Sequence, residues 1–259
     1  MNIVVLMKQV PDTYAERRLS PSDNTLDRAG VDAVINEIDE YAIEEGLLLK
    51  EAHGGEVTIL TMGPDRATES IRKALSMGAD KGVHVVDEAL HGSCAITTAK
   101  VLAKALGTLE YDLVIAGSEA TDSRLSVVPA LLSEALGVPQ LSGARKVTVD
   151  GSDITIERAT ETGFARVQAS GPAVVSVVEK INEPRYPSFK GIMAAKSKPV
   201  QQLSLSDLGI GADEVGLAAS TTTVQSFEQA PPRAAGTVVK DEGNGGSAIA
   251  EYLASKKLI

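Results

Sequence analysis

The chain has 259 residues, a formal net charge of −10 and a hydrophobic content of 43%, with no tryptophan and only 3% aromatic residues. This length allows one large domain, or a domain with an extension, around an aliphatic core; the acidic balance excludes non-specific nucleic-acid binding, which needs a basic face. The single cysteine, Cys94, excludes a disulfide framework and a cysteine-rich metal site.

The N-terminal stretch MNIVVLMKQV lacks the basic start and cleavage site of a secretion signal, and we expect a strand that begins at Asn2. No apolar run approaches the ~20 residues that a membrane span requires. We therefore expect a cytoplasmic protein in a reducing compartment, with no membrane insertion and no nucleic-acid partner.

Short apolar runs alternate with helical periods through the first 140 residues. The runs have the length of strands buried on both faces, and they are residues 3–7, 57–62, 83–86 and 113–116. Apolar residues at helical spacing follow them around Ile38, Ile71, Leu102 and Leu132. This alternation predicts an α/β fold, with a doubly wound, mostly parallel sheet of the Rossmann-like, adenine-nucleotide-binding type.

Three strand ends in this pattern are candidates for a ligand site, because such sheets bind ligands beyond the carboxyl ends of their strands. They are residues 7–13, 61–75 and 115–132. In the third, Gly117 ends a strand, and the following helix N-terminus would suit a phosphate. Ordinary helix capping explains the same loop, so both interpretations stay open. Neither G-x-G-x-x-G after a strand nor G-x-x-x-x-G-K-[ST] is present.

The second half of the chain begins with a predicted β-hairpin. Residues 146–158 alternate around Asp150-Gly151, and two further strands are predicted at 164–169 and 173–178. After residue 198 the pattern loosens, which is uncommon inside a compact domain. We predict a nucleotide-binding domain over residues 1–200 and an extended C-terminal arm over residues 201–259. The arm would lie on a partner subunit through Leu208, Val215, Leu217 and a terminal helix.

Residues of the kinds used in catalysis form no recognisable set. The three histidines lack metal-ligand spacing, and we expect a solvated His53, a strand-embedded His84 and a loop position for His91. Cys94 is expected as a small buried residue within a helix. A cluster of acids is expected on the solvated face of the first helix, namely Glu37, Asp39, Glu40, Glu44 and Glu45. No catalytic activity is therefore expected.

One proline-rich segment gives the chain its most specific feature. Residues 178–198, VEKINEPRYPSFKGIMAAKSK, place a tyrosine and a phenylalanine beside prolines after a predicted strand. Together with VLMKQVPDT, NEIDEYAIEEGLLLKE, GPDRATESIRKALSMGADKGVHV and YDLVIAGSEATD, this segment resembles the β subunits of electron transfer flavoproteins. The resemblance covers nearly the whole chain.

The resemblance implies a heterodimer whose α subunit carries most of the site for one FAD, while the β subunit binds AMP without catalysis. The pair would take electrons from acyl-CoA and related dehydrogenases, as in fatty acid oxidation, and pass them to a quinone oxidoreductase of the respiratory chain. By position the AMP pocket would comprise Leu6, Asn36, Glu37, Ile38, Asp39, Met62, Leu113, Gly117, Ala120, Asp122, Ser123, Arg124, Leu125, Ser126, Val127 and Val128.

Two departures from the family pattern bear on this site. Ser123 and Ser126 stand where many bacterial relatives have glycines, which allow close approach to a phosphate and positive φ. Arg124 either adds charge to a phosphate or is solvated. Bifurcating relatives hold a second FAD here, and we rank this alternative below AMP. Ala159 replaces an acid that relatives often carry near the subunit boundary. A different alternative function is an adenine-nucleotide-binding enzyme or sensor.

The resemblance also assigns segment 178–198 to docking of the dehydrogenase. Phe189 would enter a pocket on the dehydrogenase, and the flanking prolines would lower the entropy cost of ordering the loop. We expect Tyr186 to fold back onto the chain's own core, and Ile192 and Met193 to hold a short helix down. The expected docking residues are Glu183, Pro184, Arg185, Tyr186, Phe189, Ile192 and Met193. A basic rim is expected from Lys190, Lys196 and Lys198.

Overall fold

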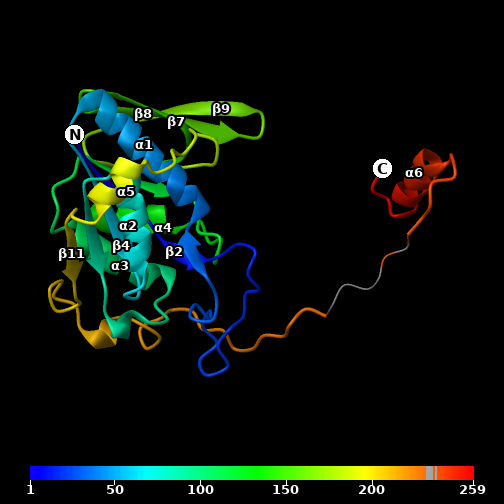
Figure 1. Cartoon of the computed structure of the whole chain (residues 1–259), viewed down its shortest axis with the longest axis horizontal. Coiled ribbons are helices and arrows are strands. Elements are labelled where there is room, and N and C mark those ends of the chain that lie inside the picture. Colours follow the sequence, from blue (N-terminus) through cyan, green and yellow to red (C-terminus); the bar gives the residue numbers. More distant parts are fainter. Residues whose placement is uncertain (232–235, 237) are drawn as a thin grey trace. The chain divides into compact units, whose positions relative to one another are not determined.

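The buried apolar runs form the central sheet that the sequence predicts. The computed structural model describes residues 1–231, 236 and 238–259, which divide into two units, Met1–Gln225 and Ser226–Ile259. Within the described residues of the first unit, nine strands form one sheet in the order β11-β5-β4-β1-β6-β10-β7-β8-β9 (Figure 1). The first six strands in this order are β11 (Val200–Leu203), β5 (Lys81–Val85), β4 (Glu56–Met62), β1 (Asn2–Leu6), β6 (Leu113–Gly117) and β10 (Ala173–Val177).

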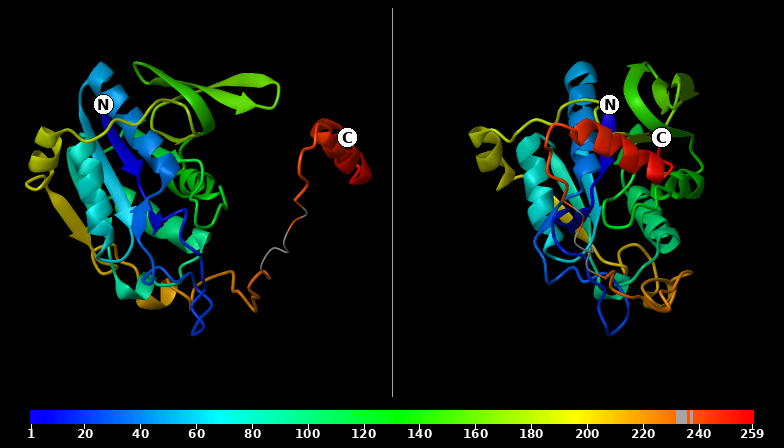
Figure 2. Two further views of the ribbon diagram at one scale, coloured as in Figure 1. Left: turned by 45° about the vertical axis from the view of Figure 1, so that its right-hand side comes forward. Right: turned by 90° about the vertical axis from the view of Figure 1, so that its right-hand side faces the viewer.

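Neighbouring strands from β11 to β7 pair in parallel, and the last three strands pair antiparallel. The antiparallel strands are β7 (Gln140–Asp150), β8 (Asp153–Thr160) and β9 (Gly163–Ser170). The hairpin turns at Gly151, whose φ of 60° suits glycine. The predicted α/β class and hairpin are confirmed, and the hairpin projects past the helices (Figure 2).

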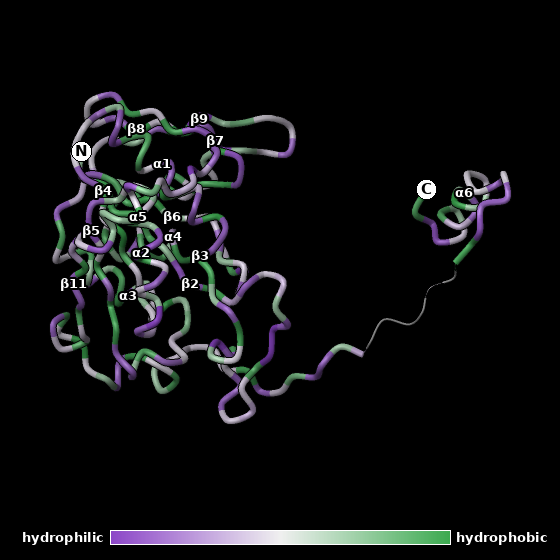
Figure 3. Tube along the Cα trace, in the orientation of Figure 1, coloured by the Kyte–Doolittle hydropathy of each residue, from purple (hydrophilic) through white to green (hydrophobic). Residues whose placement is uncertain are grey.

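Helices cover both faces of the sheet and bury two aliphatic clusters. On one face lie α1 (Glu37–His53), α2 (Ala67–Met77) and α5 (Phe189–Ala195). On the other lie α3 (Ala95–Leu106) and α4 (Val128–Leu136). The 3₁₀ turns η1 (Glu88–Leu90) and η2 (Ala212–Glu214) complete the unit. Hydrophobic stretches gather in its interior, and polar residues lie along its rim (Figure 3). The helices and strands therefore form the doubly wound arrangement expected from the alternating pattern.

An excursion between β1 and α1 was not anticipated from the sequence. It contains β2 (Gln9–Pro11) and β3 (Ala33–Ile35), which pair antiparallel in a separate two-stranded sheet. Residues 12–32 extend between them, and Asp23 Oδ2 lies within hydrogen-bond distance of His91 Nε2, at 2.8 Å. The excursion also carries Arg28, whose guanidinium reaches a carboxylate of the loop after β6. This segment therefore lies over the carboxyl ends of the strands.

The boundary of the main unit lies later than the sequence predicts. The arm was expected from residue 201, but β11 adds to the sheet edge by pairing with β5. Beyond it, Leu205, Leu208 and Val215 are buried in the second aliphatic cluster. The stretch that contains these three residues is too short to show a helical or strand period. The sequence pattern therefore does not reveal that they are buried. The compact unit therefore extends to Gln225.

The second unit carries α6 (Gly245–Ser255), the terminal helix that the sequence predicts. Its apolar side chains Ile249 and Tyr252 are more than half exposed within the described residues. Residues 232–235 and 237 of the predicted arm lie outside the described residues. Among the helices that the structure describes, none is both long and apolar enough to cross a membrane.

Several expectations about individual side chains need correction. Asp39, Glu44 and Glu45 of α1 were expected in solvent, but they are 6%, 4% and 7% exposed. The apolar period of α1 places these acids on the face that points away from the sheet, and loops that follow other strands cover this face. Cys94 is half-buried and lies directly before α3 rather than inside it. The predicted strand position of His84 is confirmed in β5; its side chain is buried, and its Nε2 lies 3.0 Å from the Gly63 carbonyl oxygen.

Candidate functional site

The carboxyl ends of β1, β4 and β6 lie side by side, and the start of α1 contacts Lys8 after β1 and Gly117 at the end of β6. Leu6 ends β1, Met62 ends β4 and Gly117 ends β6, and β1 pairs in parallel with both other strands. Leu6 is buried, while Met62 is partly exposed above the second cluster. These strand ends therefore form the floor of one site.

Asn36 joins the start of α1 to the loop after β6. Its side chain is fully buried; Nδ2 donates to the Glu119 carbonyl at 2.8 Å, and Oδ1 accepts the Thr121 N–H at 3.0 Å. This position precedes α1, yet the side chain makes no capping bond to its own helix. An amide suits the task because it donates and accepts at once. Asn36 therefore fixes the loop after β6, which is the candidate phosphate loop.

Asp39 lies one turn further along α1 beneath the same loop. Its Oδ2 accepts the Lys8 N–H at 2.8 Å. Burial raises the pKa of this carboxyl to about 7, although hydrogen bonds from Lys8, Asn36 and Gly117 oppose the rise. A Cβ at position 117 would collide with the Asp39 carboxylate, so the close approach requires glycine there.

Asp122 anchors the middle of the loop through two cations. Its side chain is 1% exposed; Lys8 Nζ donates to Oδ1 at 2.9 Å, and Arg28 Nη2 donates to Oδ2 at 2.6 Å. Burial alone would raise the pKa of this carboxyl, but the two cations outweigh burial and lower it. Asp122 therefore holds the loop to β1 and to the 12–32 excursion, and both cations lie beside the candidate phosphate site.

The tip of the loop bends through residues that are not glycine. Arg124 and Ser126 have φ values of 50° and 57°, in the left-handed region that glycine favours. Ser126 Oγ donates to Glu119 Oε2 at 2.8 Å, which supports the bend. Of the two serines that replace family glycines, Ser126 therefore keeps the glycine-like conformation, whereas Ser123 does not.

Thr121 gives this loop an unused polar group. Its residue is 8% exposed, and its Oγ1 has no hydrogen-bond partner among the described residues. The loop leads into α4, whose first N–H groups offer donors for an anion. Ala120 and Val128 are partly buried beside these groups, whereas Ser123, Arg124, Leu125 and Ser126 are exposed. The loop after β6 thus carries one buried hydroxyl without a partner and ends at a helix N-terminus, which suits an anion.

Not every predicted pocket residue lies at this site. Leu113 is fully buried at the amino end of β6, opposite the strand ends that carry the site. The prediction for Leu113 is therefore wrong, because it placed a core residue at the wrong end of its strand. Glu37 is exposed at the start of α1, and Ile38 is buried below Gly117. Sequence reasoning missed Lys8 and Arg28, since their partner Asp122 is 114 and 94 residues away.

The proposed docking segment forms a braced loop followed by α5. Ser188 caps α5, as its Oγ accepts the Gly191 N–H at 3.0 Å. Phe189 is 81% exposed, which agrees with an anchor available to a partner. Tyr186 is 96% exposed, so the expectation that it folds back onto the core is wrong. Pro187 follows it directly.

The residues that hold α5 in place differ from Ile192 and Met193, which the sequence predicts for this role. Ile192 and Met193 are about half exposed, while Ala195 is buried against α2. Lys198 was expected in a free basic rim, but its Nζ donates to the Leu75 and Ala79 carbonyls at the end of α2. The α5 helix therefore docks through backbone and lysine contacts, which leaves its apolar side chains outward.

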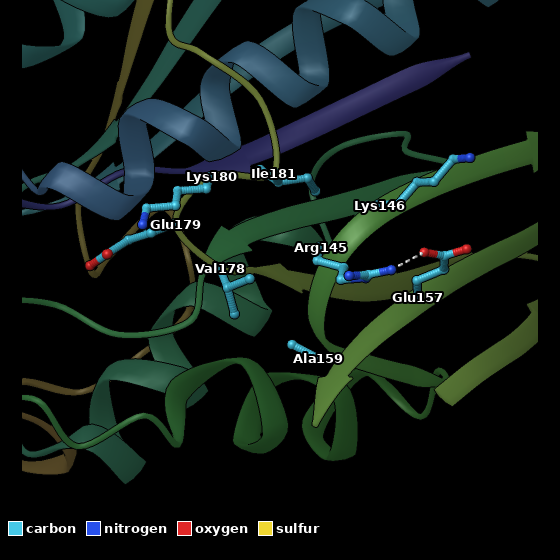
Figure 4. Close-up of a pocket in the computed structure, with 8 residues that line it drawn as sticks. All are labelled: Arg145, Lys146, Glu157, Ala159, Val178, Glu179, Lys180 and Ile181. Atoms are coloured by element: carbon cyan, nitrogen blue, oxygen red, sulfur yellow. Dashed lines mark hydrogen bonds and ion pairs between the residues drawn. The ribbon is translucent and has the colours of Figure 1, made fainter. Parts of the chain in front are cut away.

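Ala159 lines a shallow hollow of about 660 Å³ between the hairpin and the chain after β10 (Figure 4). Arg145 donates to Glu157 across it at 3.0 Å, and residues 178–181 form its opposite side. Position 159 itself therefore carries no acidic side chain, although relatives often have an acid there. No group of His, Cys, Asp or Glu able to hold a metal ion occurs within the described part of the chain.

The chain is similar to known proteins over most of its length. A family model described as "Electron transfer flavoprotein domain" matches residues 23–208. The electron transfer flavoprotein subunit beta of Mycobacterium tuberculosis H37Rv is 54% identical over 264 residues, covering 100% of this chain and 99% of its own. Its namesakes from Thermoanaerobacterium thermosaccharolyticum and Bacillus subtilis are 41% and 35% identical, covering 86% and 93% of each chain. The chain therefore belongs to the electron transfer flavoprotein family, as a beta subunit.

Proposed function

We propose that this chain pairs with an alpha subunit and that the pair carries electrons from acyl-CoA and related dehydrogenases to a quinone oxidoreductase of the respiratory chain, in the cytoplasm. A FAD shared with the alpha subunit would carry the electrons. This chain would contribute binding and docking surfaces and no catalytic group. Its membership of the beta-subunit family supports the pairing. The exposed Phe189 on a braced loop is the observation that carries the docking role.

The site at the strand ends would hold AMP as a structural ligand. Asn36 and Asp122 fix the loop around it, Thr121 Oγ1 offers an unused hydroxyl, and the N-terminus of α4 offers N–H donors. These groups suit a phosphate and its ribose. AMP would thereby tie the loop after β6 to α1, which begins at Glu37 and contacts the docking loop further along.

Extraction of nucleotides from the purified heterodimer tests this assignment. We expect one FAD and one AMP per pair, separated by chromatography and identified by mass. A yield of two FAD would favour the bifurcating alternative. An adenine nucleotide that the chain alone hydrolyses would contradict the carrier role altogether.

The docking role is tested by Phe189→Ala in the heterodimer. Truncation of an exposed aromatic anchor is expected to slow flavin reduction by an acyl-CoA dehydrogenase about tenfold, which corresponds to ~1.4 kcal/mol of lost contact. The flavin content should stay unchanged, because Phe189 lies outside the strand-end site. Stopped-flow absorbance of the flavin measures both.

Ile96→Ala is the matched control for this variant. Ile96 is an exposed apolar residue, 41% accessible, on α3 at the other face of the sheet. Its truncation should leave the reduction rate within about twofold. Equal rates for Phe189→Ala and the parent protein would remove the anchor role.

A further inference from the structure

Two carboxylates on α1 are buried beneath the docking loop rather than beneath the sheet. Glu44 is 4% exposed and Glu45 is 7% exposed, and both lie about two turns beyond Asn36 on the same helix. Buried carboxylates are rare unless they are paired, because removal of the charge from water is costly. The hydrogen-bond partners of Glu44 and Glu45 therefore indicate which segment these two buried carboxylates hold in place.

Arg185 of the docking loop is the partner of Glu44. Nε donates to Oε2 at 2.8 Å and Nη2 donates to Oε1 at 2.8 Å, in a two-pronged pair. The Arg185 backbone N–H also donates to Glu44 Oε2 at 3.2 Å. One carboxylate thus fixes both the side chain and the backbone of the same loop residue. Arg185 Nη1 reaches Glu51 Oε1 at 2.6 Å, but Glu51 is 57% exposed at its side chain.

Asn182 provides a second attachment three residues earlier. Its Nδ2 donates to the Tyr41 carbonyl at 3.1 Å and to Glu45 Oε2 at 3.0 Å. Both acceptors belong to α1, so the loop is tied to one rigid helix at two points. Between Val178 and Ser188 the chain has no helix or strand of its own. These side-chain contacts therefore fix its path over α1, while the far end of the segment is attached to α2 through α5.

We propose that Glu44 is the positioning residue of the docking loop: through the pair of its buried carboxylate with Arg185 it sets the place of Phe189 before a dehydrogenase arrives. This inference rests on the proposed docking role of segment 178–198. A pre-ordered loop loses less conformational entropy on binding, so the pair improves docking without touching the partner. Glu44 acts through Arg185 and takes no part in electron transfer itself.

Arg rather than Lys is required for this arrangement. The planar guanidinium engages both oxygens of Glu44 and reaches Glu51 with a third nitrogen, which a single ammonium cannot reproduce. The hydrogen bonds to Glu44 and Glu51 raise the pKa of Arg185, and the guanidinium stays charged throughout the physiological range. The contact between Arg185 and Glu44 therefore does not depend on a change in the charge of Arg185.

The test compares Glu44→Gln with Glu51→Gln in the complete heterodimer. Both variants remove one carboxylate charge beside Arg185 at constant size, but only the first charge is buried. In Glu44→Gln we expect amide exchange over residues 182–189 to rise about tenfold and the KM for the heterodimer, with an acyl-CoA dehydrogenase as reductant, to rise about tenfold. The kcat should stay within about twofold, and Glu51→Gln should resemble the parent in all three measurements.

The outcomes separate this inference from the docking role itself. If Glu44→Gln leaves either the exchange or the KM unchanged while Phe189→Ala raises the KM, the positioning role is overturned and docking stands. If neither variant raises the KM, the docking role fails and this inference fails with it. Arg185→Lys serves if Glu44→Gln does not fold, and it should give the same rise in KM with the same kcat.

Discussion

Asp39 is expected in solvent from the sequence but is buried in the structure. Its carboxyl is buried between α1 and the end of β6, where burial raises its pKa to about 7. Three N–H donors surround it and limit the rise, so the group is held by hydrogen bonds in either protonation state. A helical period alone places this acid in solvent. Contacts with Lys8 and Gly117, which are distant in sequence, bury it.

This burial predicts a pH dependence of stability. An unfolded Asp ionises near pH 4, whereas folded Asp39 stays protonated to about pH 7. The contribution of Asp39 to stability is therefore full below pH 4 and is lost as the pH rises to 7, by up to about 4 kcal/mol. Urea unfolding of the heterodimer between pH 4 and pH 8 measures it.

Asp39→Asn is the variant that isolates this effect. Asparagine keeps the size and an acceptor oxygen but does not ionise. We expect the variant to lose less stability than the parent between pH 4 and pH 7, so that the two curves diverge over this range. Parallel curves would show that Asp39 is ionised in the folded protein.

At the scale of elements, α1 serves two parts of the molecule. Its start holds the loop after β6 through Asn36, and its middle holds the docking loop through Glu44 and Glu45. The sequence placed α1 correctly because its apolar period is strong. The attachments could not be predicted, because each joins α1 to a segment more than 80 residues away. Loop positions follow from such pairings rather than from local propensity.

The terminal helix α6 belongs to the arm that we predict to lie on the alpha subunit. Ile249 and Tyr252 are 63% and 61% exposed among the described residues, which is unfavourable for a helix that stands alone. Removal of Ser226–Ile259 is expected to weaken pairing with the alpha subunit at least tenfold. The helical and sheet structure of Met1–Gln225 should persist, because both aliphatic clusters lie within that unit.

Analytical ultracentrifugation of the shortened chain with its alpha subunit measures this affinity, and circular dichroism checks the fold. The shorter deletion of residues 234–259, which starts outside the described residues, should act in the same direction. A shortened chain that pairs as tightly as the parent would show that the terminal unit is dispensable.

At the scale of the whole molecule, the sheet order explains where the candidate site lies. β1 lies between β4 and β6, so the chain's first strand is central and its carboxyl end is flanked by two others. The 12–32 excursion begins there and reaches the loop after β6 through Arg28. The candidate site is therefore assembled from segments that are far apart in the sequence.

The sequence by itself determined the α/β class, the hairpin, the helical period of α1 and the family, because hydrophobic period and specific motifs are local properties. Tertiary structure alone decided that Leu113 belongs to the core, that Tyr186 is exposed and that the main unit continues to Gln225. It also decided that acids of α1 are buried. The physical reason is the same in each case: burial and pairing depend on segments that meet only in the folded chain, whereas the period of a helix or strand does not.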